Sequence, residues 1–182
     1  MAELEAFDKS TEVSGRSIVA FINAFPNRRE IMESILARHD IENPDKDHWY
    51  PMSLWLEVLQ ELTERLSSRI IFDIGQAMIK SIKIPSHIES LRDALRYLNV
   101  AYRASHRNGD IGGYELWEFN EKRRIALIEC TNPYPSEMDR GIISAITARY
   151  KPHDGHFANV TLDKSAPSRK DGAESCTFIV SW

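Results

Sequence analysis

The chain has 182 residues, of which 42% are hydrophobic, and a formal net charge of −4. This length and apolar fraction suit a single domain with a buried core, and they exclude an intrinsically disordered chain. The acidic balance provides no basic surface for nucleic acid or an anionic membrane, so we expect neither as a partner. No apolar run approaches the roughly 20 residues of a spanning helix, so we expect no membrane insertion.

The start of the chain and its cysteines predict where the protein resides. Met1 to Glu5 lacks the basic residues and following apolar stretch of a signal peptide. The two cysteines, Cys130 and Cys176, are too few for a disulfide framework. We therefore expect a cytoplasmic protein.

The amino-terminal part has apolar residues at helical spacing. We expect a helix over residues 15–25, a second from the cap Asn27 to about Ala37, and a polar loop over 40–50. Pro51 suits the first turn of a third helix. The apolar face of this third helix consists of Leu54, Trp55, Val58, Leu59, Leu62 and Leu66.

Two further helices are expected before residue 107. Residues 69–84 are apolar nearly all round, so this helix should run through the core. Ser86 and Glu89 form a capping box that opens a long helix to about His106. A partly protonated His106 would favour the negative end of that helix dipole. The apolar face of the long helix consists of Ile88, Leu91, Leu95, Leu98 and Tyr102.

After residue 110 the apolar residues alternate or cluster in short runs, which is typical of strands. The order predicts an α+β fold, with amino-terminal helices packed on an antiparallel β-sheet and one intervening helix in the carboxyl-terminal half. We expect one domain over 1–182, comprising a helical part over 1–67 and an α+β part over 68–182. The predicted elements are a hairpin of 114–119 and 123–130, a helix over 137–149 capped by Ser136 and Asp139, a strand over 157–162, a polar loop over 167–174 and a strand over 176–182.

Catalytic motifs are missing from the sequence. It contains no nucleophile elbow, no zinc-protease helix, no phosphate-binding loop and no dinucleotide fingerprint. The glycines at 109, 112 and 113 precede a strand rather than a helix, so we interpret them as a turn. The sequence therefore predicts no catalytic residue.

The metal-binding side chains are sparse, and no metal site is predicted. His153 and His156 could share an ion with Cys130, or they could lie at the tip of a solvated loop. Cys130 and Cys176 each lie at the end of a strand and could face one another. Small buried hydrophobes are the default interpretation of such cysteines, and a redox or metal role stays open.

The aromatic residues are more informative as a group. Together with the helix that is apolar all round, they suit an enclosed apolar pocket between the helices and the sheet. Tyr102 is the expected polar contact of a small ligand there. The residues expected to line the pocket are Phe72, Met78, Leu98, Tyr102, Tyr114, Trp117 and Tyr134.

Three segments of the carboxyl-terminal half resemble a known family. They are the residues from Gly112 to Tyr134, from Asp139 to Ile143 and from Gly172 to Phe178. The pattern resembles the 4-vinyl reductase domain family, which shares its fold with haem-nitric-oxide sensor domains and TRAPP vesicle-tethering subunits. The resemblance covers about residues 68–182. It implies a helical amino-terminal part on an antiparallel sheet of four or five strands.

The resemblance carries over little of the family's metal and haem chemistry. Members of that family typically end with an acid, a cysteine, a glycine and a second cysteine that can hold zinc. Asp163, Gly172 and Cys176 resemble three of these, but Ser168 replaces the first cysteine, and a hydroxyl is a poor zinc ligand. The resemblance therefore implies an incomplete zinc site.

The haem sensors of the same fold have a histidine in the long central helix and a Tyr-x-Ser-x-Arg run. The comparable helix here, residues 98–102, contains no imidazole. The comparable run keeps Tyr134 and Ser136 but has Met138 at the arginine position. Haem binding is therefore not implied, and the cofactor stays unknown.

The leading hypothesis is a cytoplasmic sensory domain that holds a small apolar molecule and signals to a protein partner. An alternative is an interaction or dimerisation module without a ligand, in which Trp55 on the helix after Pro51 anchors a homodimer. A haem-based gas sensor and a tetrapyrrole-related reductase are further alternatives that the residues support less.

Overall fold

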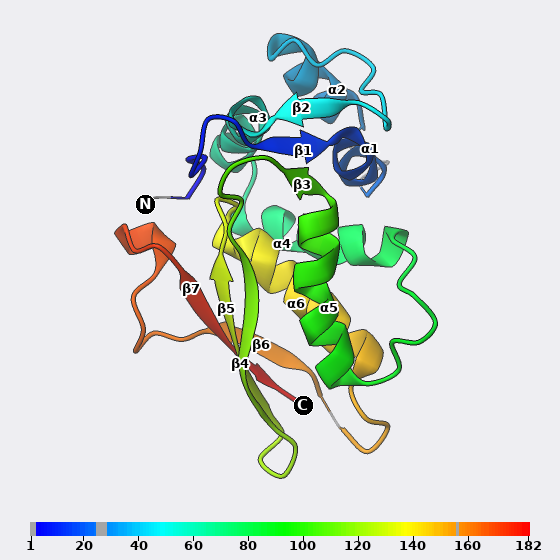
Figure 1. Cartoon of the computed structure of the whole chain (residues 1–182), viewed down its shortest axis with the longest axis vertical. Coiled ribbons are helices and arrows are strands. Elements are labelled where there is room, and N and C mark those ends of the chain that lie inside the picture. The colour runs from blue at the N-terminus through cyan, green and yellow to red at the C-terminus, as the bar shows by residue number, and fades with distance from the viewer. Residues whose placement is uncertain (1–2, 25–28, 156) are drawn as a thin grey trace.

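The computed structural model describes residues 3–24, 29–155 and 157–182, and Figure 1 shows its layers. One end of the molecule contains a small sheet and three helices, α1 (Gly15–Asn23), α2 (Arg29–Arg38) and α3 (Met52–Arg65). The other end contains a four-stranded antiparallel sheet covered by helices. The predicted α+β fold, with helices on an antiparallel sheet and one intervening helix, is confirmed.

The four-stranded sheet has the order β4-β5-β7-β6. Its strands are β4 (Gly113–Asn120), β5 (Ile125–Thr131), β6 (Asn159–Leu162) and β7 (Cys176–Ser181). The predicted hairpin is confirmed as β4 and β5, with a register shift between Leu116 and Glu118. Cys130 of β5 lies directly opposite Cys176 of β7, as expected, and both thiols are free and buried.

Three helices cover one face of this sheet. They are α4 (Ser68–Ser81), α5 (Leu91–Ala104) and α6 (Ser136–Tyr150). Helices α5 and α6 contact the strands, and α4 packs on α6 from outside (Figure 1). The predicted burial of α4 is confirmed at Ile71 and Ile74, which are at most 4% exposed.

A second sheet, absent from the sequence-based expectations, joins the two ends of the molecule. Its strands are β1 (Glu12–Ser14), β2 (Trp49–Pro51) and β3 (His106–Arg107), and they lie in the order β2-β1-β3. Strands of two or three residues are too short to produce a visible alternation in the sequence. Because β3 follows α5 directly, this sheet connects the end of that helix to the amino-terminal part.

The predicted start of the long helix is wrong. Ser86 and Glu89 belong to the preceding loop, and α5 begins at Leu91. Ser90 is the actual cap, because its hydroxyl accepts the Asp93 N–H at 3.1 Å and donates to the Asp93 carboxylate at 2.6 Å. Two serines in this stretch, Ser86 and Ser90, are each followed by an acid three residues later, so the sequence offers the same capping pattern twice.

The expected cap of the helix after Pro135 is also wrong. Pro135 is the N-cap residue and provides no side-chain bond, while the Glu3 carboxylate accepts the Ser136 N–H at 2.9 Å. Asp139 is fully buried beneath the helix instead of capping it. The physical reason is the buried guanidinium of Arg169, which lies within the expected polar loop over 167–174 and pairs with Asp139.

Other boundaries agree with expectation to within a few residues, and two expectations need comment. The cap expected at Asn27 lies outside the described residues. Trp55 is 3% exposed and packs edge-on against Phe21 at 5.0 Å, so it is wrong as an interface anchor. No described helix has the length and hydropathy needed to cross a membrane.

Helices α4 and α6 cross at two glycines with their backbones in contact. A Cβ added at Gly75 would lie 2.1 Å from the Met138 carbonyl oxygen, and one at Gly141 would lie 2.1 Å from the Phe72 carbonyl oxygen. Neither carbonyl can move without distorting its helix. The pair therefore fixes the distance between the core helix and the helix on the sheet.

We predict that Gly141→Ala lowers the free energy of unfolding by about 3 kcal/mol, because a methyl group must separate two helix backbones. Urea unfolding followed by circular dichroism measures the change. Ala148→Ser, at an exposed position near the end of the same helix, should stay within about 0.5 kcal/mol of the parent. Equal midpoints for the two variants would contradict the assigned contact.

Candidate ligand-binding site

An apolar cavity of about 210 Å³ lies where the amino-terminal helices meet α4, α5 and α6. Its walls come from both parts of the chain, so neither part alone encloses it. The lining is dominated by hydrocarbon and aromatic side chains. The lining residues are Arg16, Ser17, Ala20, Phe21, Trp55, Met78, Ile79, Ile82, Leu98, Ala101, Tyr102, Ser105, His106, Tyr114, Tyr134, Met138 and Ile142.

The structure gathers five of the seven side chains expected at a pocket. They are Met78, Leu98, Tyr102, Tyr114 and Tyr134. Their role as ligand contacts stays a prediction.

Phe72 and Trp117 are not among the lining residues. The Phe72 ring packs under the Arg140 guanidinium at 4.2 Å. Trp117 is 55% exposed, because it lies three residues from the inward-facing Tyr114 and therefore points to the opposite face of β4.

Sequence reasoning missed the contribution of the amino-terminal part and of His106. The burial of Trp55 was indicated by its place on the apolar face of its helix, but nothing in the sequence showed that this face lines the cavity. His106 was expected as a partly protonated residue at the end of the long helix, and that expectation is wrong, since it lies in β3 and is 6% exposed. Its burial results from its position in β3, which depends on pairing with β1 more than 90 residues away.

The aromatic rings of the cavity form one packed cluster. The Tyr102 ring stacks on His106 with centroids 4.1 Å apart. Tyr102 also meets Tyr114 and Tyr134 edge-on at 5.6 and 6.2 Å. Such edge contacts hold the rings in fixed orientations. The cluster therefore forms a rigid wall on one side of the cavity.

The hydrogen bonds of His106 define its tautomer. Nδ1 lies 2.7 Å from the Tyr102 carbonyl oxygen, which can only accept, so Nδ1 bears the proton. Nε2 lies 2.6 Å from the Tyr134 hydroxyl and therefore accepts its proton. Burial lowers the pKa of His106 to about 4. The imidazole is thus neutral at physiological pH.

The other two tyrosine hydroxyls also donate to protein atoms. The Tyr102 hydroxyl donates to the Ile111 carbonyl oxygen at 2.5 Å, and the Tyr114 hydroxyl donates to Asp139 Oδ1 at 2.5 Å. Burial raises the pKa of Tyr102, Tyr114 and Tyr134, so all three remain protonated. The hydroxyl protons of all three tyrosines in the cavity wall are therefore already in hydrogen bonds with protein acceptors.

A buried ion pair lies behind Tyr114. Arg169 Nη2 and Asp139 Oδ2 are 2.5 Å apart, with side chains 1% and 0% exposed. Asn132 bonds to both, donating to Asp139 Oδ1 at 3.3 Å and accepting from Arg169 Nη1 at 2.8 Å. Burial raises the pKa of the Asp139 carboxyl, and the guanidinium with these donors opposes the rise. The group ties α6, β4 and the loop before β7 together.

The residues of the expected incomplete zinc site have other partners. Cys176 Sγ accepts from the Arg169 backbone N–H at 3.3 Å, and the Ser168 hydroxyl donates to Asp171 at 2.6 Å. Asp163 accepts from Ser165 in an exposed turn. Within the described residues, no three His, Cys, Asp or Glu side chains are grouped as for a metal ion.

His153 does not share a site with Cys130. His153 is exposed in a loop that Arg124 holds through Asp154, with Nη2 and Oδ2 2.5 Å apart. Arg124 precedes β5 at one end, and Cys130 lies near its other end, about 20 Å away at the usual rise per residue. His156 lies outside the described residues.

The fold is similar to that of solved H-NOX domains. A Cs H-NOX mutant with 4-cyano-L-phenylalanine at site 5 matches with a TM-score of 0.69 at 11% identity, over 92% of this chain and 95% of that one. An oxygen-binding H-NOX domain related to soluble guanylate cyclases matches with a TM-score of 0.63 at 13% identity, over 92% and 94%. The H-NOX domain from Shewanella oneidensis in its Fe(II)CO ligation state gives 0.63 at 10%, over 92% and 97%.

These identities are low, so the likeness establishes an H-NOX-like fold and nothing further. No protein-family model and no curated protein matches the sequence.

The residues around the cavity do not fit a haem. His106 is the single imidazole among the lining residues, and both its ring nitrogens already have partners. Met138 lines the cavity where an arginine would be needed to pair with a propionate. The volume of about 210 Å³ is also below the roughly 300–1,000 Å³ of pockets for drug-sized ligands.

We predict that His106 makes the protein less stable in acid. Unfolding returns its pKa from about 4 to 6.5, so the unfolded chain binds the proton first and stability falls as pH drops through this window. The loss amounts to about 3 kcal/mol. Urea unfolding across this pH range measures it, and His106→Gln should flatten the slope. An unchanged slope in that variant would contradict the buried neutral imidazole.

For the buried ion pair, we predict that Asp139→Asn and Arg169→Met each cost about 3–5 kcal/mol, because each leaves one charge buried without a partner. The double variant Asp139→Asn/Arg169→Met should cost less than the sum of the singles. Urea unfolding provides all of these values. Lys170→Met, beside Arg169 but half-exposed, is the control. Strictly additive losses would contradict the coupling.

Proposed function

We propose that the protein is a sensory domain that binds a small, neutral, largely apolar molecule in this cavity and signals its presence to a protein partner. The observation that carries the proposal is an apolar cavity lined by packed aromatic side chains. The fold around this cavity is similar to that of a solved oxygen-binding H-NOX domain. Apolar pockets with a few positioned polar groups hold such molecules by burial.

The size of the cavity limits the ligand. An apolar cavity of roughly 150 Å³ is large enough to bind benzene. The cavity here, of about 210 Å³, therefore suits a molecule with one ring or two fused rings. A larger ligand would require the aromatic wall to move, and edge-on ring contacts oppose that movement.

The hydrogen-bond pattern limits the polarity of the ligand. The protons of Tyr102, Tyr114 and Tyr134 are all donated to protein acceptors, so these oxygens can only accept from a ligand. Arg16 also lines the cavity, but its side chain is 75% exposed and pairs with Asp47. A buried carboxylate would therefore find little compensation for its lost hydration. A hydrocarbon, or a ring with one N–H or O–H donor, fits best.

The connection between the two ends of the molecule supports a signalling role. The cavity is lined by Phe21 and Trp55 from the amino-terminal part and by Leu98 from α5. Strand β3 follows α5 and pairs with β1, which precedes α1. A ligand that separates α5 from α1 would therefore shift the small sheet as well.

We further propose that the chain is a divergent relative of the 4-vinyl reductase domain family and acts in the cytoplasm.

The test is binding of neutral and charged probes of matched size. We expect naphthalene and indole to bind one per chain, and indole-3-carboxylate to bind at least about tenfold more weakly because its charge would be buried. Isothermal titration calorimetry and native mass spectrometry measure the affinities. Ala101→Phe fills the cavity and should abolish binding, while Val100→Phe, at an exposed position of the same helix, should not.

Two results would overturn the proposal. Equal binding by the parent and Ala101→Phe would show that the probes do not occupy the cavity. Failure of every neutral probe to bind would favour an interaction module without a ligand. A visible absorbance spectrum of the purified protein provides an independent check, since a haem band would contradict the poor fit of that group.

A further inference from the structure

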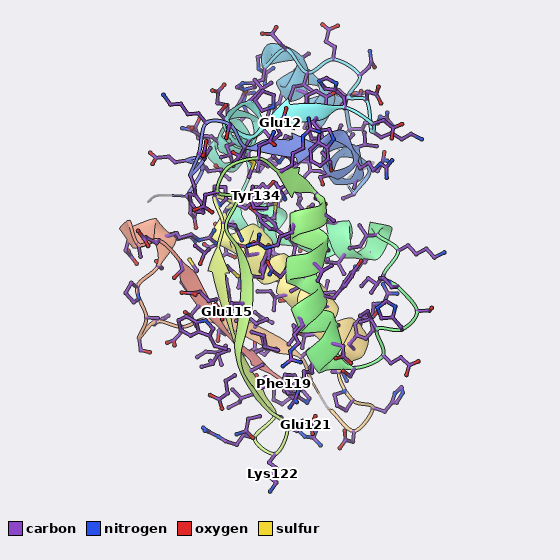
Figure 2. The ribbon with its side chains drawn as sticks, viewed as in Figure 1. Glu12, Glu115, Phe119, Glu121, Lys122 and Tyr134 are labelled. Atoms are coloured by element: carbon purple, nitrogen blue, oxygen red, sulfur yellow. The ribbon has the colours of Figure 1, made fainter. Side chains whose placement is uncertain are left out.

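A second crevice lies at the opposite end of the helices that wall the cavity. It has a volume of about 390 Å³ and lies between the start of α5, the end of α6, the β4–β5 hairpin and Trp182. Figure 2 shows Phe119 and Glu121, which line this crevice, near the hairpin tip and far from Tyr134 of the cavity. The crevice is therefore separate from the site described above.

Cationic side chains converge on this crevice without carboxylate partners. Arg92 comes from α5, and Arg149 and Lys151 come from the end of α6. Within the described part of the chain, none of these three forms an ion pair, although Lys151 Nζ donates to the Gly155 carbonyl oxygen. His153 lines the same crevice.

The crevice also has two carboxylates at its edge. Glu89 and Glu121 are exposed, and neither pairs with a cation among the described residues. Three permanent cations and two side-chain carboxylates therefore line one crevice, and no two of them form an ion pair within the described residues.

Arg92 lacks an acceptor that its environment requires. Its Nε atom is buried, and no described group accepts a hydrogen bond from it. The guanidinium lies over the Phe119 ring at 4.8 Å, and that ring stacks on Trp182 at 4.9 Å on the crevice wall. A buried donor without an acceptor costs about 1–3 kcal/mol, so native proteins provide a partner for nearly all of them. Packing on the Phe119 ring thus holds the guanidinium at the crevice wall, and its two Nη atoms, which are not buried and bond to no described group, are available to a molecule in the crevice.

We propose that this crevice is a binding site for a small organic anion, with its carboxylate or phosphate group held by Arg92 and Arg149. An oxyanion can accept hydrogen bonds from the Nη atoms of the guanidinium groups, and it neutralises cations that form no ion pair within the described residues. The Phe119 and Trp182 rings and Pro152 provide an apolar wall for the rest of the ligand. The site does not depend on the function proposed for the cavity.

The test follows the side-chain Nε–H signal of Arg92 by NMR in phosphate-free buffer. Benzoate and inorganic phosphate are the anionic probes, and benzamide is an uncharged probe of the same shape as benzoate. We expect saturable binding of one benzoate or phosphate per chain and no binding of benzamide. Arg92→Met and Arg149→Gln should each weaken binding at least about tenfold, because each removes a charged donor.

Arg96→Gln is the matched control, since Arg96 is an exposed cation of the same helix that does not line the crevice. It should bind benzoate within about twofold of the parent. If Arg92→Met fails to fold, Arg92→Lys keeps the charge but removes the two Nη donors and should still weaken binding.

Three outcomes would overturn the proposal. The first is a signal that shifts linearly without saturation and equally in all variants, which would show an adventitious ion only. The second is equal affinity for benzamide and benzoate, which would show an apolar contact without anion recognition. The third is the same loss of affinity in Arg96→Gln as in Arg92→Met, which would show a general effect of net charge.

Discussion

The buried pair of Asp139 and Arg169 is the contact on which the rest of the structure depends. Two charges without access to water must satisfy each other and their remaining hydrogen-bonding atoms inside the protein. Here Asn132, Tyr114 and the Cys176 sulfur complete the set. The consequence is geometric, because helix α6, strand β4 and the loop before β7 must all meet at one point. The polar loop over 167–174 is thereby fixed to the core at Ser168 and Arg169, while most of its other residues are exposed.

This requirement extends to the cavity through Tyr114. Its hydroxyl is held by Asp139, so its ring stands at a fixed angle against Tyr102, which in turn stacks on His106. A cavity in a close-packed interior persists only if its walls cannot collapse into it. The rings are held by hydrogen bonds at their polar ends and by edge contacts along their sides. The pocket is therefore a product of the polar network behind it.

The crossing of α4 and α6 provides the second constraint. At Gly75 and Gly141 the two backbones touch, which brings the core helix as close to the sheet helix as two helices can approach. Met78 and Met138, near this crossing, then form one side of the cavity. Figure 1 shows α4 beside α6 along this contact, with α5 on the sheet. The apolar character of α4 was evident in its sequence, but its crossing point was not.

Local patterns in the sequence predicted elements whose signals lie within about one helical turn or one hairpin. The apolar residues of α4 and the face of α5 at Leu95 and Leu98 are examples, as is the β4–β5 hairpin. The start of α5 was misplaced because two serines offered the same capping pattern. The small sheet was missed because its strands have only two or three residues each. Five of seven expected pocket residues do line the cavity, since aromatic residues on buried faces tend to meet in one core.

The sequence by itself determined the α+β class, the order of the main helices and strands, and an aromatic core rich enough for a pocket. Tertiary structure alone decided that Asp139 pairs with Arg169 and that His106 is neutral and buried. The physical reason is the same in each case. These outcomes depend on partners far apart in the chain, such as Glu12 with Arg107 across β1 and β3. Periodicity and capping report only on neighbours within a few residues, so they contain no information about such pairs.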